Sequence, residues 1–331
     1  MIGKRGRADY ELLRKIQVGN APRGAVKLTD DGRGFVSNTS QNTISEIDPI
    51  NLEEVRRITV GFGPRGLGIV PGNRYILVSN SGSDTVSIVD LHANEEVRQI
   101  PTGRDPRHMA ITADGRYAYI CIWGADVVVR LNLAGLGTDD LDSVGIETEF
   151  DMGETAHPYS AAIDPSGRFV FVANTQAPYV SVIDRVTEQV AKVDVGDIGG
   201  RAVAFSADGR YALASIETTS KVAVIDIDRL QVTRQIPVGP GPRGIAVDDD
   251  EILYVTNFAR TNPGWIKHDE LPGGPNMLTA VHLGSASLAE DVGSFSYQAI
   301  EVGYGPCSVS VVDTARLRSR TEVAAGATSG R

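Results

Sequence analysis

A short phrase built around Pro-Arg returns along the chain, and it constrains the fold more than any other feature. The clearest copies are Ala21-Pro22-Arg23-Gly24, Gly63-Pro64-Arg65-Gly66, Asp105-Pro106-Arg107-His108 and Gly241-Pro242-Arg243-Gly244. With three weaker copies, the proline position falls at residues 22, 64, 106, 158, 200, 242 and 306, in steps of 42, 42, 52, 42, 42 and 64. A period near 42 with two insertions is typical of four-stranded propeller blades.

Each repeat carries signals for four strands in the same order. An apolar run such as residues 244–247 follows the Pro-Arg corner, and a turn such as Asp114-Gly115-Arg116 comes next. Asp-Gly favours the backbone of a tight hairpin turn. Residues 75–80 and 85–90 are typical of a second and a third strand, and the polar residues 96–100 suit an outer edge. We therefore predict four-stranded antiparallel blades.

The two ends of the chain bear on how the ring closes. Residues 11–19 resemble the outer strands at 54–61 and 231–236, so we expect this N-terminal strand to pair with the last blade and close the circle. Residues 308–313 fit a first strand and a third strand equally well. We predict an all-β, seven-bladed propeller, with six blades as the alternative, as one domain over residues 8–323 with flexible termini at 1–7 and 324–331.

These repeats carry a family resemblance. The recurring PRG, DGR and VSVID motifs resemble the YVTN-type β-propeller family, whose defining tetrapeptide is present as Tyr254-Val255-Thr256-Asn257. The resemblance extends from about residue 8 to residue 257 and implies a seven-bladed propeller whose first strands line a central channel. It does not select an activity, because the family includes binding proteins, surface proteins and relatives of enzymes.

The Pro-Arg corners predict a positively charged channel mouth. In a propeller these corners open on one face, so the arginine of each corner should occupy an equivalent place around the channel. The five are Arg23, Arg65, Arg107, Arg201 and Arg243. Converging guanidinium groups suit a carboxylate or phosphate ligand through bidentate hydrogen bonds. The alternative is that each arginine is a structural part of its repeat.

Departures from the repeat add candidates at the same mouth. Tyr159 stands in the arginine position of blade four, His157 precedes its proline, and His108 follows Arg107. In an enzyme, His157 and His108 would transfer protons or bind a metal with Glu154 or Glu217. The alternative is that both histidines belong to the repeat. The chain has no HxxxH or CxxC pair, so we expect no metal or other cofactor, although a divalent metal stays possible.

The loops after the second strands should open on the same face. They contribute Trp123, and Glu217 where other blades have asparagine, and we expect Asn38, Asn80, Asn174 and Asn257 there as well. The insertion at residues 258–277 carries Trp265 and His268 and would be either a lid or a mobile excursion. A second, acidic insertion at residues 134–149 should lie on the opposite face. Cys307 takes the arginine position of the last repeat and lacks any local nucleophile signature.

Composition narrows the classes of partner and function. With 32 basic and 42 acidic residues the formal net charge is −10, which argues against nucleic acid. No apolar run is long enough for a membrane span, and no signal peptide is evident. We expect a cytoplasmic protein, or one outside the cytoplasm if a signal peptide has been removed.

Two functions stay open. The first is a binding or scaffold protein that holds a small anionic ligand or a protein partner at the arginine-lined mouth. The alternative is an enzyme (a lyase, lactone hydrolase or cyclase, with or without a metal) that acts on a small secondary metabolite at the same place. Whether there is catalysis is left undecided.

Overall fold

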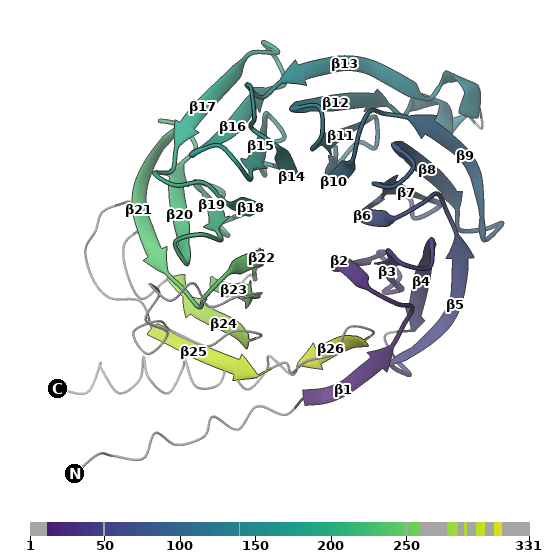
Figure 1. Ribbon diagram of the computed structural model, residues 1–331, viewed down its shortest axis with the longest axis horizontal. Coiled ribbons are helices and arrows are strands. Elements are labelled where there is room, and N and C mark those ends of the chain that lie inside the picture. Colours follow the sequence, from purple (N-terminus) through teal and green to yellow (C-terminus); the bar gives the residue numbers. More distant parts are fainter. Residues whose placement is uncertain are drawn as a thin grey trace.

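The computed structural model describes residues 12–48, 50–138, 140–248, 251–258, 277–283, 288–289, 296–301 and 308–312. Within these ranges the chain forms six four-stranded antiparallel sheets and one two-stranded sheet. The sheets follow one another around a central axis, as the blades of a seven-bladed propeller do (Figure 1). The predicted all-β propeller is confirmed, whereas the predicted domain limits lie outside the described residues.

Strand order is the same in the six four-stranded blades. The innermost strands are β2 (Pro22–Leu28), β6 (Pro64–Ile69), β10 (Pro106–Ile111), β14 (Pro158–Ile163), β18 (Gly200–Phe205) and β22 (Pro242–Val247). The second strands are β3 (Gly34–Asn38), β7 (Tyr75–Asn80), β11 (Tyr117–Ile122), β15 (Phe169–Asn174), β19 (Tyr211–Ile216) and β23 (Ile252–Asn257). Each innermost strand therefore begins at its corner phrase and runs along the channel.

The third and fourth strands complete the blades outward. The third strands are β4 (Thr43–Asp48), β8 (Thr85–Asp90), β12 (Val127–Asn132), β16 (Tyr179–Asp184), β20 (Lys221–Asp226) and β24 (Met277–His282). The outer strands are β5 (Glu53–Thr59), β9 (Glu95–Pro101), β13 (Gly145–Asp151), β17 (Val190–Asp194), β21 (Gln231–Pro237) and β25 (Ser296–Glu301). Burial falls toward the outside: all six residues of β7 are buried, but only Ile100 in β9 is.

The hydrophobic core lies between neighbouring blades. One cluster joins Leu77 and Ile88 of the second blade to Ile120 and Leu131 of the third, all fully buried. The second and third strands are apolar on both faces because each face packs against another blade. This packing fixes the positions of the innermost strands around the channel.

The N-terminal strand closes the ring, as predicted. Strand β1 (Leu12–Gln17) pairs antiparallel with β26 (Ser308–Val312), and Gln17 lies opposite Ser308. In Figure 1 these two strands lie between β25 and β5. Since β1 corresponds to an outer strand, β26 occupies the place of a third strand.

The acidic insertion lies between β12 and β13, as expected, and forms two short 3-10 turns, Ala134–Gly137 and Leu141–Ser143. In the part of the chain that the structure describes, no helix is long and apolar enough to cross a membrane.

Candidate functional site

The corners that carry the arginines share one backbone conformation. The residue before the proline position has a positive φ in all six described corners: Ala21 (52°), Gly63 (64°), Asp105 (59°), His157 (51°), Gly199 (97°) and Gly241 (66°). Proline suits the following position because its φ is fixed and it has no N–H to satisfy. The next residue is thereby held at the same place in every blade.

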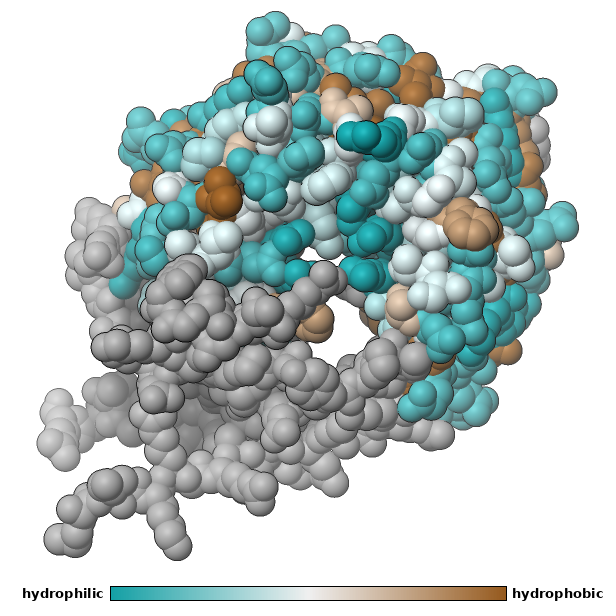
Figure 2. All heavy atoms as spheres, viewed as in Figure 1, coloured by the Kyte–Doolittle hydropathy of each residue, from teal (hydrophilic) through white to brown (hydrophobic). Residues whose placement is uncertain are grey.

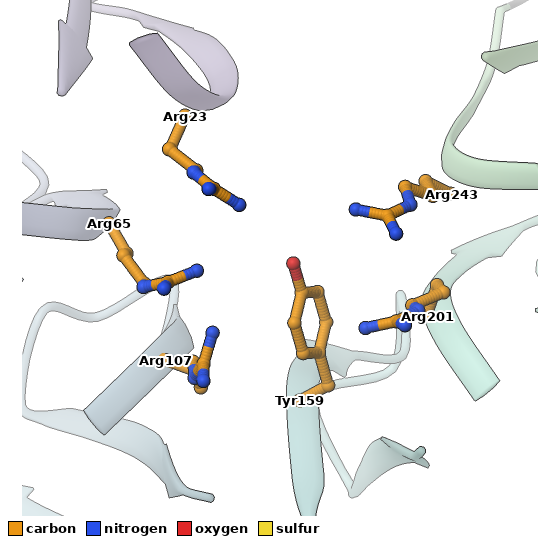
Figure 3. A pocket seen from close by; sticks show the side chains of 6 residues that line it. All are labelled: Arg23, Arg65, Arg107, Tyr159, Arg201 and Arg243. Carbon is orange, nitrogen blue, oxygen red and sulfur yellow. The ribbon is translucent and has the colours of Figure 1, made fainter. Parts of the chain in front are cut away.

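The second residues of the six innermost strands surround one cavity of about 230 Å³. Its walls are Arg23, Arg65, Arg107, Tyr159, Arg201 and Arg243, which we call the arginine ring (Figure 3). The structure thus brings together the five arginines and the tyrosine that the sequence placed at the mouth. Figure 2 shows strongly hydrophilic residues gathered around the centre of this face.

Serine hydroxyl groups hold the backbone of the ring from the neighbouring blade. Ser37 Oγ lies 2.8 Å from the carbonyl oxygen of Arg65, and Ser215 Oγ lies 2.9 Å from that of Arg243. Ser79 Oγ donates to the carbonyl of Arg107 in the same way. These serines precede the last residue of their second strands, and sequence reasoning missed them although the VSN phrase repeats in the first two blades.

Close approach between blades also requires glycine at position 66. A Cβ atom there would lie 2.3 Å from the carbonyl oxygen of Arg107, well inside van der Waals contact. Only glycine therefore lets the second and third blades approach this closely at the ring.

Carboxylates balance part of the ring's charge. Arg107 Nη2 donates to Asp105 Oδ2 at 2.5 Å. Arg243 Nη2 lies 2.7 Å from Glu217 Oε1, and Arg201 is paired with the other oxygen of the same carboxylate. One negative charge thus serves two guanidinium groups, which leaves this side of the ring with a net positive charge.

Arg65 has no carboxylate partner among the described residues. Its Nε is buried and forms no hydrogen bond within that part of the chain. Burial lowers the pKa of Arg65 to about 10, and the positive charges of Arg107 and Arg23 contribute to the shift. The guanidinium stays protonated at neutral pH, so the ring has a second uncompensated positive charge.

Tyr159 is held between two guanidinium groups. The ring centroid lies 4.8 Å from Arg201 Cζ and 5.8 Å from Arg107 Cζ, within the range of cation–π interactions. Its hydroxyl group points toward the middle of the cavity (Figure 3). The cavity therefore offers a phenol donor beside several guanidinium donors.

His108 lies next to Tyr159, with 5.1 Å between the ring centroids. The pKa of His108 is lowered to about 4. Burial is the largest cause, and the positive charges of Lys27, Arg107, Arg65 and Arg201 lower it further. The residue is partly exposed, so solvent or a ligand can reach it. The imidazole is neutral at pH 7 and can accept a proton or a hydrogen bond.

His157 and Trp123 pack against each other instead of lining the cavity. Their rings stack at 4.2 Å with an interplanar angle of 18°, and His157 Nδ1 lies 2.8 Å from the carbonyl oxygen of Trp123. Trp123 Nε1 donates to Thr175 Oγ1 at 3.1 Å. The Trp123 ring centroid also lies 5.1 Å from Arg107 Cζ, so this pair helps to position a guanidinium group of the arginine ring.

The asparagines at the ends of the second strands do not face the mouth, and that expectation is wrong. Asn38, Asn80 and Asn174 are fully buried, and Asn257 is nearly so. Their side-chain amides bond the next strand: Asn38 Nδ2 donates to Ser45 Oγ at 2.7 Å, and Asn80 Nδ2 to Ser87 Oγ at 2.7 Å. They tie the blade together.

The strand register also corrects the placement of Glu217. Ile216, not Glu217, takes the asparagine position, because Ile216 pairs with Gly200 as Asn80 pairs with Pro64. Glu217 instead follows its second strand directly, as Trp123 and Phe258 do. Each of these three residues contacts the arginine of its own blade.

Some predicted residues lie outside the described residues, namely Trp265, His268 and Cys307. Glu154 is described and exposed. Over the described ranges, no group of three or more His, Cys, Asp or Glu side chains could hold a metal ion. Glu217, one of the suggested ligands, is engaged by two arginines instead.

Comparison with known proteins supports the propeller fold. Residues 67–231 match the family model for "Lactonase, 7-bladed beta-propeller". No curated protein sequence matches the chain.

Solved structures with a similar fold have names that imply different reactions. Hydrazine synthase from Kuenenia stuttgartiensis is similar with a TM-score of 0.68 and 18% identity, over 92% of this chain and 91% of that one. Virginiamycin B lyase from Staphylococcus aureus is similar with a TM-score of 0.69 and 10% identity, over 90% of each chain. A "putative 6-phosphogluconolactonase" from Bacteroides uniformis is similar with a TM-score of 0.66 and 15% identity, over 86% of this chain and 87% of that one. At these identities the likeness shows the propeller fold alone.

Proposed function

We propose that this protein binds a small anion, a carboxylate or a phosphate, in the arginine ring. The observation that carries the proposal is the convergence of five guanidinium groups on one cavity, where Asp105 and Glu217 compensate only part of the charge. Guanidinium groups match carboxylate and phosphate geometry, and the phenol of Tyr159 adds a neutral donor. The protein has a net charge of −10, so the ring is a local positive region on an acidic molecule.

A second candidate is hydrolysis of an anionic lactone in the same cavity. The neutral imidazole of His108 beside Tyr159 favours it, because a general base must be unprotonated to activate water. Guanidinium and phenol donors would stabilise the oxyanion that forms when water attacks the lactone carbonyl. The family model for lactonases and the phosphorylated substrate implied by the name 6-phosphogluconolactonase agree with this candidate.

Calorimetric titration with inorganic phosphate and with citrate tests the binding proposal. The Arg65→Gln variant should bind each anion about ten- to a hundredfold more weakly, since a hydrogen bond to a charged group contributes about 1.5–3 kcal/mol. Affinity should also fall as salt rises. Arg229→Gln is the matched control, because Arg229 is exposed and pairs with Asp226 away from the ring. Equal affinity in wild type and Arg65→Gln would contradict the proposal.

The lactonase candidate has its own test. Acid release from 6-phosphogluconolactone should be faster with wild type than with His108→Gln, while both proteins bind inorganic phosphate alike. If wild type is no faster than the uncatalysed reaction, the lactonase candidate fails; if both proteins are equally fast above that rate, His108 is not the base.

A further inference from the structure

Lys27 occupies a strand position at which each of the other five described blades has glycine or alanine. Strand β2 is one residue longer than the other innermost strands, and the extra residue shifts its register. Lys27 pairs with Phe35, the fourth residue from the end of its second strand. The residues with the equivalent partner in the other five blades are Gly68, Ala110, Ala162, Ala204 and Ala246.

The surroundings of Lys27 are those of a side chain in a channel. It belongs to an innermost strand (Figure 1) and its side chain is exposed, yet burial by the surrounding protein lowers its pKa. A side chain that projects into a solvent-filled channel satisfies both observations. Within the described part of the chain it makes no hydrogen bond or ion pair.

In strand β10, His108 directly follows the ring residue Arg107 and precedes Ala110, the residue at the register of Lys27, so it lies between the two levels. Lys27 and the ring residues Arg107 and Arg65 all lower the pKa of His108, whereas burial alone lowers the pKa of Lys27. Positive charges of both levels therefore act on the imidazole of His108. Four residues along a strand rise about 13 Å, and the extra residue in β2 shortens this to about 10 Å between Arg23 and Lys27.

We propose that Lys27 is a second anion contact in the channel and that the ligand is an elongated dianion. One carboxylate or phosphate would occupy the arginine ring, the middle of the molecule would pass His108, and the second anionic group would bind Lys27 Nζ. This inference rests on the proposed anion binding and adds the length and charge of the ligand. It also places the neutral His108 beside the middle of such a molecule.

Calorimetry with α,ω-dicarboxylates of four to ten carbons and with monocarboxylates of equal length tests this proposal. In wild type, chains of about six to ten carbons should bind at least tenfold more tightly than the matched monocarboxylates, because their carboxylates span the two levels. Lys27→Ala should remove this gain and leave monocarboxylate affinity unchanged, and Lys27→Arg should retain most of it. Alanine occupies this register in four of the other five described blades, so the variant is expected to fold.

The outcomes separate the two proposals. Lys221→Ala is the control, since Lys221 bonds Gln235 on the outer strands at 2.9 Å. If Lys27→Ala binds long dicarboxylates as wild type does, or loses mono- and dicarboxylates equally, the second contact is refuted. If monocarboxylates and phosphate bind through Arg65 but chain length has no effect, only the elongated ligand is refuted. If none of these anions binds wild type, both proposals fail.

Discussion

Replacing Glu217 with glutamine should strengthen anion binding while it weakens the fold. The carboxylate accepts hydrogen bonds from Arg243 at 2.7 and 3.0 Å and is also paired with Arg201, so it occupies donors that face the cavity. Glutamine keeps the shape and one acceptor but removes the negative charge. Two guanidinium groups then become available to a ligand, and repulsion between Glu217 and that ligand disappears.

The size of the effect follows from Coulomb's law. An anion on the far side of the guanidinium groups would lie roughly 6 Å from the carboxylate. At an effective dielectric constant of about 20, a unit charge at this distance contributes about 2.8 kcal/mol. Screening at physiological salt reduces this by about half, so a monoanion should bind about tenfold more tightly and a dianion about a hundredfold. Because hydrogen bonds to a charged group are lost, the melting temperature should fall by a few degrees.

Titration calorimetry with acetate and with inorganic phosphate at pH 8, combined with thermal melts, measures both effects. The control is Glu54→Gln, which changes the net charge equally and breaks a similar pair with Arg57 on an outer strand, at 2.7 Å. If Glu217→Gln binds acetate and phosphate no better than wild type, the carboxylate does not compete for the ring and the charge argument is wrong. An equal gain in Glu54→Gln would assign the effect to net charge.

Two further predictions concern stability. Ser37→Ala should lower the free energy of unfolding by about 1 kcal/mol in denaturant titrations, because the hydroxyl lies 2.8 Å from the carbonyl oxygen of Arg65; an unchanged value would show that the serine does not brace the corner. The pKa of His108 is about 4 in the folded protein against 6.5 ordinarily, so the unfolded chain binds the extra proton and stability should fall as pH drops from about 6.5 to about 4. His108→Gln should flatten this part of the pH profile, and an unaltered slope would assign the acid sensitivity to other groups.

The arginine ring was predictable because it follows from the repeat alone. A phrase that recurs at a constant period must occupy equivalent positions in a closed ring, so Arg65 and Arg243 had to share a channel whatever the details of packing. The same reasoning placed Tyr159 correctly, since it aligns with the arginines through its proline. What the period cannot supply is the hydrogen-bond partner of each arginine, because several of these partners come from neighbouring blades. Ser37 bonds the backbone carbonyl of Arg65, and Glu217 bonds the guanidinium group of Arg243.

The asparagine error has a different cause. Asn38 and Asn80 end their second strands, and a polar residue at a strand end is expected to face solvent. In this fold the hydroxyl groups of the third strand lie within reach, and the amide bonds Ser45 or Ser87 inside the blade. A buried polar group is stable when it is hydrogen-bonded, so the repeated Asn and Ser of the strand phrases form a structural pair. Polarity alone could not distinguish this role from ligand binding.

The one-residue shift in β2 shows why a site residue can escape a sequence reading. Counted from the corner proline, Lys27 aligns with Ile69, a partly buried position beside the core, where a lysine would suggest only a solvated edge. The pairing in the structure instead aligns Lys27 with Gly68, because β2 accommodates one extra residue between Arg23 and Lys27. A shift of one residue exchanges the two faces of a strand. The insertion therefore places the lysine at a register that is glycine or alanine elsewhere, and it does so in the only described blade where a long basic side chain occupies that level.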